Sequence, residues 1–260
     1  MTDDPGHRGT AVPGTAVITG AASERGIGRA LAARLAAAGW SLGLLDVDAE
    51  VEKVAAALGA EHGVAAAGVV ADIADPASVD AAVATFETDL PPVAALANIA
   101  GVSSPVSFLD TDLATWERVM RINATGTFVV SKRVVPGMVE RGYGRVVSLG
   151  STAMQNGGGT YSKSTYAASK GAMEAFSRAL ALEVAAHGVT VNVVAPATID
   201  TDIMGGRITD DRKPAFLAQL PVGRLGTPRD VAALIEFLFG EEAGYITGAT
   251  YNINGGLRIG

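Results

Sequence analysis

One stretch near the amino terminus decides the fold: Thr15-Ala-Val-Ile-Thr-Gly20-Ala-Ala-Ser-Glu-Arg-Gly26-Ile-Gly28-Arg-Ala-Leu-Ala-Ala-Arg-Leu35. It joins a short apolar run, suited to a buried strand, to a glycine-rich turn and an Ala/Leu-rich run with helical spacing. The glycines let the backbone turn sharply and approach a pyrophosphate, whose charge is met by amides at the helix amino terminus. The alternative is an ordinary glycine turn without a ligand. We therefore predict a strand–turn–helix unit with a candidate dinucleotide-binding turn.

The same alternation of short apolar runs and longer helical stretches continues toward the carboxyl terminus. We expect strands at Ala16–Thr19, Ser41–Asp46, Ala65–Ala71, Val93–Ala97, Arg145–Ser148, Thr190–Ala195 and Thr250–Ile253. We expect helices at Gly26–Ala38, Ala49–Leu58, Pro76–Asp89, Leu113–Arg141, Tyr166–His187 and Pro228–Phe239. This pattern predicts an α/β fold, a single Rossmann-type doubly wound parallel sheet of about seven strands flanked by helices.

The domain is expected to span residues 15–260, after a disordered tail over 1–14 that is rich in proline and glycine. Glycines at Gly39 and Gly188 are expected to end their helices, and Thr227 with Pro228 to begin one. Two stretches, 151–165 and 201–222, are expected to be irregular and to border a binding site.

Composition excludes several classes of function. The net charge of −7 without a basic cluster argues against a nucleic-acid partner. The chain has no cysteine, and its three histidines (His7, His62 and His187) are scattered, so we expect no disulfide and no metal site. It has neither an apolar run long enough to span a bilayer nor a signal pattern, so we expect a cytoplasmic protein without membrane contact.

The choice of cofactor depends on Asp46, at the end of the second expected strand. A carboxylate there can accept hydrogen bonds from the adenosine ribose hydroxyls and would repel a 2′-phosphate. Asp46 therefore favours NAD over NADP, although Arg25 beside Gly26 offers a cation to a phosphate. The alternative is that Asp46 and Asp48 only cap the following helix.

A candidate catalytic pair lies in the helix expected from Tyr166. Tyr166 and Lys170 are four positions apart, so their side chains share one helix face. A phenol titrates near pH 10, and a base that works near neutrality needs its pKa lowered to about 7. We expect the ammonium of Lys170 to lower the pKa of Tyr166. The alternative is a solvated helix face.

The chain resembles the short-chain dehydrogenase/reductase family of the Tyr-x-x-x-Lys type from about Thr15 to the carboxyl terminus. The resemblance is carried by Thr19-Gly20 through Gly28, Asp72, Asn98-Ile-Ala-Gly101, Asn123, Ser151, Tyr166-Ala-Ala-Ser-Lys170, Pro196 through Thr201, Tyr245-Ile-Thr-Gly248 and Gly255-Gly256. It implies a catalytic tetrad of Asn123, Ser151, Tyr166 and Lys170. It also implies cofactor contacts from Gly20, Ser23, Arg25, Gly26, Ile27, Gly28, Asp46, Asp72, Ile73, Asn98, Ala100, Gly101, Tyr166, Lys170, Pro196, Ile199 and Thr201.

Within that resemblance, Lys170 would hold the nicotinamide ribose, Ser151 the substrate oxygen, Asn123 a relay water, and Thr201 the carboxamide. Three of these residues also have a simpler interpretation. Ser151 can be a loop hydroxyl, with Ser148, Ser162 and Ser164 as rival candidates for its role. Asn123 can be a helix-interior residue that bonds its own backbone, and Thr201 can be part of a polar loop. The chain departs from the family in a glycine turn two residues longer, in Ile99 and Ala197, and in a longer loop from Ser151 to Tyr166.

We therefore expect hydride transfer between NAD(H) and a secondary alcohol or ketone. The loop after Gln155, with Arg207, Asp210 and Arg212, favours a small polar hydroxylated substrate such as a sugar, sugar acid or polyol. The alternatives are a 3-oxoacyl-thioester (acyl carrier protein) reductase and a non-enzymatic NAD-binding regulator. The helix after Tyr166 is rich in small residues, and in this family it packs against its twin, which implies a homotetramer, with a dimer as the alternative.

Overall fold

In the computed structural model, which describes residues 14–159 and 161–259, seven strands form one parallel sheet. The strands are β1 (Thr15–Thr19), β2 (Ser41–Asp46), β3 (Ala66–Val70), β4 (Val93–Asn98), β5 (Gly144–Leu149), β6 (Val189–Pro196) and β7 (Thr250–Ile253). Their order is β3-β2-β1-β4-β5-β6-β7 and every neighbouring pair is parallel, which confirms the predicted doubly wound α/β fold. The tail expected over residues 1–14 lies outside the described residues apart from Gly14.

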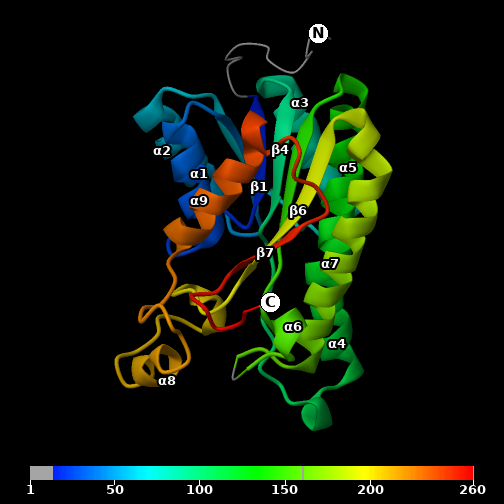
Figure 1. The fold of residues 1–260 in the computed structure, drawn as a ribbon. Helices are drawn as coiled ribbons and strands as arrows, with labels where there is room; N and C mark the ends of the chain where they lie inside the picture. Colours follow the sequence, from blue (N-terminus) through cyan, green and yellow to red (C-terminus); the bar gives the residue numbers. More distant parts are fainter. Residues whose placement is uncertain (1–13, 160, 260) are drawn as a thin grey trace, which may run out of the picture.

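Helices cover both faces of this sheet (Figure 1). The α-helices are α1 (Ile27–Ala37), α2 (Glu50–His62), α3 (Pro76–Asp89), α4 (Leu113–Met120), α5 (Gly126–Arg141), α6 (Ala153–Asn156), α7 (Ser164–Val184), α8 (Lys213–Leu217) and α9 (Pro228–Phe239). The shorter turns are the 3₁₀ segments η1 (Phe108–Asp110), η3 (Ala185–His187), η4 (Asp202–Met204) and η5 (Glu241–Ala243), and the π-helical η2 (Arg121–Thr125). Among the described residues, none of these helices is both long and apolar enough to cross a membrane.

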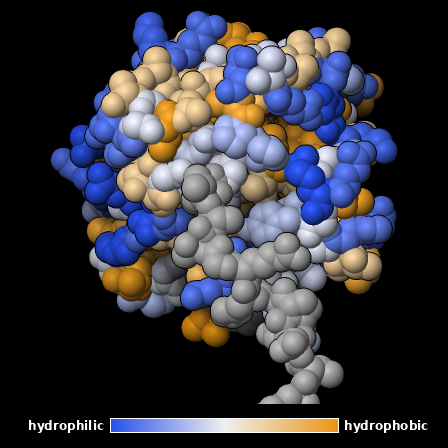
Figure 2. Space-filling view, turned by 90° about the horizontal axis from the view of Figure 1, so that it is seen from above, coloured by the Kyte–Doolittle hydropathy of each residue, from blue (hydrophilic) through white to orange (hydrophobic). Residues whose placement is uncertain are grey.

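Two apolar cores fill the spaces between the sheet and its helix layers. On one face α1, α2 and α9 pack around Leu31, Leu35 and Ile235, and on the other α3, α5 and α7 pack around Phe86 and Met138, all fully buried. The end of the molecule where the strands begin carries many hydrophilic side chains with separated hydrophobic ones between them (Figure 2). Strand order reverses between β1 and β4, which places a crevice beyond their carboxyl ends.

Local sequence signals set several element ends as predicted. Thr227 and Asp230 form a capping box at the start of α9, with Pro228 at the first helical position. Gly188 is the C-cap of η3 with φ 74°, and Gly39, with φ 84°, follows Ala38, the C-cap of α1. Most expected boundaries differ from the observed ones by one or two residues, and α2 runs four residues beyond its expected end.

Three expectations need correction. The helix expected over 113–141 is interrupted by the π-helical turn η2, which separates α4 from α5. The stretch expected to be irregular over 151–165 contains α6, and the one over 201–222 contains η4 and α8. These helices are five residues or shorter, so they depend on surrounding packing and leave little periodic signal in the sequence.

Candidate active site

A long cleft follows the carboxyl ends of the strands. It consists of a cavity of about 470 Å³ at the ends of β1 to β4 and a cavity of about 380 Å³ beside β5, β6 and α7. Four residues line both cavities: Ile27, Leu149, Thr201 and Ile203. The two cavities therefore adjoin, and a ligand with two separate groups can extend from one into the other.

The glycine turn borders the larger cavity and packs closely against its own helix. Gly20 has φ 73°, and a Cβ on Gly28 would lie 2.2 Å from the Gly20 carbonyl oxygen, so both positions require glycine. The turn borders the larger cavity at the amino end of α1, which has no side-chain cap. The first backbone amides of a helix lack partners within the helix and favour a bound anion. These residues fit the pyrophosphate of a dinucleotide.

Asp46 lies at the end of β2 and lines the larger cavity. Its Oδ2 accepts a hydrogen bond from the amide of Ala22 (2.9 Å) and its Oδ1 accepts one from the amide of Asp48 (3.1 Å). The amide of Glu50, at the start of α2, is instead bonded by Asp48. Asp46 therefore supports the glycine turn and does not bond the first amide of α2, which Asp48 bonds instead.

Most of the expected cofactor-binding residues border the cleft. Those lining the larger cavity are Gly20, Ser23, Gly26, Ile27, Asp46, Asp72, Ile73, Ala100, Gly101 and Thr201. Those lining the smaller cavity include Ile27, Tyr166, Pro196, Ile199 and Thr201. Gly28, Asn98 and Lys170 lie behind the lining: Gly28 packs against Gly20, and Asn98 donates to the buried hydroxyls of Ser131 and Ser148.

Arg25 is placed differently from the expectation that it offers a free cation to a phosphate. Its guanidinium pairs with Asp200 (2.6 Å) and Asp202 (3.2 Å), which follow β6. Asp46, which lines the larger cavity at the end of β2, is not among its ion-pair partners. The positive charge of Arg25, which could have favoured a 2′-phosphate, is therefore neutralised by the carboxylates of Asp200 and Asp202.

Tyr166 and Lys170 lie on one face of α7, as their spacing predicts. Both are buried, and the Lys170 ammonium lies 5.9 Å from the centroid of the Tyr166 ring. The ammonium donates a hydrogen bond of 2.6 Å to the carbonyl oxygen of Leu149 at the end of β5. Tyr166 lines the smaller cavity, so its phenol faces the space available to a substrate while Lys170 supports it from behind.

The expected lowering of the Tyr166 pKa is wrong for the protein alone. Burial raises the pKa of the Tyr166 phenol, and hydrogen bonding with Ser151 opposes that rise only in part. Burial also lowers the pKa of Lys170 to about 8. Both shifts have one cause: the pair is removed from water, which disfavours the charged form of each group. The four-residue spacing of Tyr166 and Lys170 in the sequence does not indicate how far folding removes their side chains from water.

Ser151 lines the smaller cavity at the start of α6, together with Tyr166. Its hydroxyl accepts a hydrogen bond from the amide of Ala153 (3.2 Å). Of its rivals, Ser148 is buried and accepts from Asn98, and Ser164 is exposed at the start of α7. Ser162 also lines the cavity. Of these four serines, only Ser151 opposes the burial-driven rise in the Tyr166 pKa.

Asn123 lies in the π-helical turn and its side chain is held by residues far away in sequence. Its Oδ1 accepts from the Val102 amide (2.8 Å), and its Nδ2 donates to the Val102 carbonyl (2.9 Å) and to the Ser169 hydroxyl (3.0 Å). The side chain therefore does not bond its own helix. It links the loop after β4 to α7, one residue before Lys170.

The lining of the smaller cavity includes two aromatic side chains, one of which is stacked against a cation. Tyr161 and Phe216 line it with ring centroids 6.2 Å apart. The Arg212 guanidinium stacks over the Tyr161 ring at 4.4 Å. Its Nε and Nη2 atoms are buried without a hydrogen-bond partner among the described residues. A desolvated guanidinium of this kind favours a nearby anionic or hydroxylated group.

Comparisons with known proteins agree with this geometry. A family model described as enoyl-(acyl carrier protein) reductase matches residues 20–258. An uncharacterized short-chain type dehydrogenase/reductase of Sinorhizobium fredii is 37% identical over 94% of this chain and 97% of the relative. The chain belongs to the short-chain dehydrogenase/reductase family. It is thus an oxidoreductase-family protein, as its motifs predicted.

Other members of the short-chain dehydrogenase/reductase family show how varied its substrates are. A 3-oxoacyl-[acyl-carrier-protein] reductase of Escherichia coli is 37% identical over 94% of this chain and 97% of its own length. A 2-(S)-hydroxypropyl-CoM dehydrogenase of Xanthobacter autotrophicus is 36% identical, covering 89% and 92%. A solved short-chain dehydrogenase/reductase structure from Brucella melitensis, described as glucose/ribitol dehydrogenase, superposes with a TM-score of 0.84 at 32% identity, covering 95% and 97%.

Several groups that organise the site were not identified from the sequence. They are the Leu149 carbonyl that binds Lys170, the Val102 backbone and Ser169 hydroxyl that hold Asn123, and the Asp200 and Asp202 carboxylates that pair with Arg25. Backbone groups carry no residue-specific signal, and the other partners are separated by tens of residues or more. Only folding brings them together.

Proposed function

We propose that this chain is an NAD-dependent oxidoreductase that transfers a hydride between NAD(H) and a secondary alcohol or ketone. One observation carries the proposal: Tyr166 borders the smaller cavity, backed by buried Lys170, where that cavity adjoins the one lined by the glycine turn and Asp46. When bound, a nicotinamide cofactor would supply the hydride donor or acceptor. This chain would supply the proton chemistry and the orientation.

The tetrad residues take distinct roles in this proposal. During reduction Tyr166 donates the proton of its hydroxyl to the ketone oxygen and becomes a phenolate. In the oxidation direction the reverse step starts from that phenolate, which accepts the proton of the carbinol. Ser151 holds the same oxygen by a hydrogen bond, Lys170 holds the cofactor ribose from behind, and Asn123 positions the loop after β4 and α7. Since burial raises the Tyr166 pKa, the resting phenol is protonated and ready to act as an acid at neutral pH.

The cofactor is proposed to be NAD. Asp46 places a carboxylate in the cavity where the adenosine ribose would lie, and a 2′-phosphate there would meet a like charge. Arg25, the cation closest in sequence to the turn's second glycine, is paired with two carboxylates. NADP is the less favoured alternative, because the chain would have to break those pairs to compensate the additional phosphate.

The substrate is proposed to be a small polar hydroxylated compound: a sugar, a sugar acid or a polyol. Hydroxyl groups from Ser151, Ser162 and Tyr161 line the smaller cavity, and Arg212 stacks behind Tyr161. The acid is favoured among these because the Arg212 guanidinium places a positive charge beside Tyr161, which lines the cavity. A 3-oxoacyl thioester is the alternative, supported by the similarity to the Escherichia coli reductase.

The test is a panel of sugars, sugar acids, polyols and 3-oxoacyl thioesters, each assayed with NAD(H) and NADP(H) by the absorbance of the reduced nicotinamide. The proposal expects turnover with at least one hydroxylated class and NAD(H). NADH binding without turnover of any compound would instead favour the NAD-binding regulator, whose function Tyr166→Phe should leave intact.

The assembly is proposed to be a homotetramer, with a dimer as the alternative. Small residues Ala168, Ala172 and Ala175 are exposed along α7, so they do not pack against the chain's own sheet. Nearby, Phe128 of α5 is half-exposed and meets Phe176 of α7 edge to face. A second copy could approach this face closely. Light scattering during size-exclusion chromatography tests the proposal, and a monomer would contradict it.

A further inference from the structure

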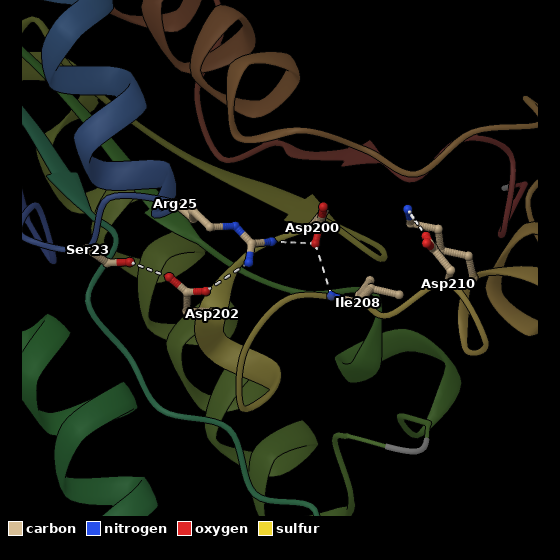
Figure 3. A network of polar contacts seen from close by, with 7 residues as sticks. Ser23, Arg25, Asp200, Asp202, Ile208 and Asp210 are labelled. Atoms are coloured by element: carbon tan, nitrogen blue, oxygen red, sulfur yellow. Dashed lines mark hydrogen bonds and ion pairs between the residues drawn. The ribbon is translucent and has the colours of Figure 1, made fainter.

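Four side chains join the glycine turn to the loop that follows β6 (Figure 3). Arg25 donates from Nη2 to Asp200 Oδ1 (2.6 Å) and from Nη1 to Asp202 Oδ1 (3.2 Å). Ser23 donates from its hydroxyl to Asp202 Oδ2 (3.2 Å). We call Ser23, Arg25, Asp200 and Asp202 the clasp. Ser23 and Arg25 lie within the lengthened glycine turn, just before Gly26.

The clasp bridges the cleft itself. Ser23 and Asp202 line the larger cavity from its two sides, and Thr201 and Ile203, on either side of Asp202, line both cavities. The loop after β6 therefore crosses the junction of the two cavities, and the clasp fastens it to the turn proposed to hold the pyrophosphate. A dinucleotide extending through both cavities would lie beneath this connection.

The loop after β6 also has anchors that do not involve the turn. Asp200 Oδ1 accepts from the amide of Ile208 (3.3 Å), which is buried, and the Ser103 hydroxyl donates to the Ile203 carbonyl (2.8 Å). These contacts hold the loop to its own base and to the loop after β4. The clasp supplies the connection to the glycine turn, so opening it would release that side of the loop and leave the rest attached.

The charged side chains of the clasp are partly exposed to solvent. The side chains of Arg25, Asp200 and Asp202 remain 30%, 26% and 45% exposed, and ion pairs at such positions are individually weak and screened by salt. Arg25 also compensates two carboxylates that would otherwise repel the phosphates of a dinucleotide. Replacing Arg25 by a neutral residue should thus loosen the loop and make the cleft more negative. Neutralising Asp202 should loosen the loop but make the cleft less negative.

We infer that the clasp closes the cofactor cleft and sets the rate at which a nicotinamide dinucleotide leaves it. This inference rests on the proposed function, in which the cleft binds NAD(H). Arg25, Asp200 and Asp202 are positioning residues in this role. They hold the loop that carries Thr201 over the cleft and touch no reacting atom.

The test measures NADH binding and release by stopped-flow fluorescence, without any substrate, in the full-length wild type and in Arg25→Gln and Asp202→Asn. Both variants should release NADH about 5 to 10 times faster. Arg25→Gln should also bind more slowly at low salt, because two carboxylates lose their partner, whereas Asp202→Asn should bind at the wild-type rate or faster. Added salt should speed release from the wild type and have a smaller effect on Arg25→Gln.

Asp210→Asn provides the matched control. Asp210 belongs to the same segment but pairs with Lys213, away from the clasp (Figure 3), and should leave both rates unchanged. The exchanged pair Arg25→Asp with Asp202→Arg should recover slow release if direct pairing matters. If circular dichroism shows that Arg25→Gln and Asp202→Asn are folded and both release NADH at the wild-type rate, the inference about the clasp is wrong while the proposed function stands. A wild-type protein that does not bind NADH would overturn the proposed function as well.

Discussion

The Lys170 ammonium donates a hydrogen bond of 2.6 Å to the carbonyl oxygen of Leu149, and this bond ties α7 to the carboxyl end of β5. Leu149 is also one of the four residues shared by the two cavities. The bond therefore fixes the Tyr166–Lys170 pair at the junction where a cofactor and a substrate would meet.

Replacing Tyr166 with phenylalanine should lower kcat by about 10²- to 10⁴-fold, because the proton donor is lost while the ring still fills its place. NADH affinity, measured by fluorescence titration, should stay within about threefold of the wild type. Tyr161→Phe is the matched control: it removes a hydroxyl from the same cavity and should change kcat by less than about tenfold. Equal losses in the two variants would contradict the role assigned to Tyr166.

The stability of the protein should depend on Lys170 in alkaline solution. Burial lowers the Lys170 pKa from 10.5 to about 8, so the folded state binds fewer protons than the unfolded state between these values. The cost of burying the ammonium is fully present below pH 8 and disappears as the pH rises toward 10.5. Lys170→Met should thus raise Tm by roughly 5 °C at pH 7 and by much less near pH 10.5, measured by calorimetry. A pH-independent difference would contradict the buried charge.

Asn123→Ala should destabilise the fold, because the Val102 amide and carbonyl and the Ser169 hydroxyl lose a buried partner. We expect a loss of about 3 kcal/mol in the free energy of unfolding, measured by urea titration. Asn156→Ala, which removes an exposed turn hydrogen bond to Gly158, should cost less than about 1 kcal/mol. Similar losses in both variants would mean that Asn123 does not link these elements.

Asp46→Asn should shift cofactor preference toward NADPH. The amide retains an oxygen that can accept from Ala22, so the glycine turn keeps its support while the negative charge disappears. The ratio of kcat/KM for NADPH to that for NADH should rise about 10- to 100-fold. Asp48→Asn, which neutralises the exposed neighbouring carboxylate, should leave the ratio within about threefold. If Asp46→Asn does not change this ratio, the main support for NAD as the cofactor is lost.

Arg212→Gln tests the proposed preference for acids. With a hydroxy acid as substrate, kcat/KM should fall about 10-fold, because a positive charge beside the cavity lining is lost. With a neutral polyol the change should stay within about threefold. Arg207→Gln, at an exposed position of the same loop, is the control and should affect neither substrate. Equal effects of Arg212→Gln on acid and polyol would contradict an anion-binding role.

The features that could be predicted from the sequence are those that depend on near neighbours in the chain. Alternating apolar runs located all seven strands, and Thr227 with Pro228 marked the start of α9 to the residue. The four-residue spacing placed Tyr166 and Lys170 on one face of α7. Helical and strand periodicity and capping are local properties, so their signals are complete before the chain folds.

The tertiary structure alone decided which distant groups meet and how much water they lose. Arg25 pairs with Asp200 and Asp202, about 175 residues away, instead of facing a phosphate. Asn123 is held by Val102 through a π-helical turn that no periodicity indicated. The Tyr166 pKa rises because packing removes its surroundings from water. Long-range partners and desolvation depend on the assembled fold, so local sequence patterns could not reveal them.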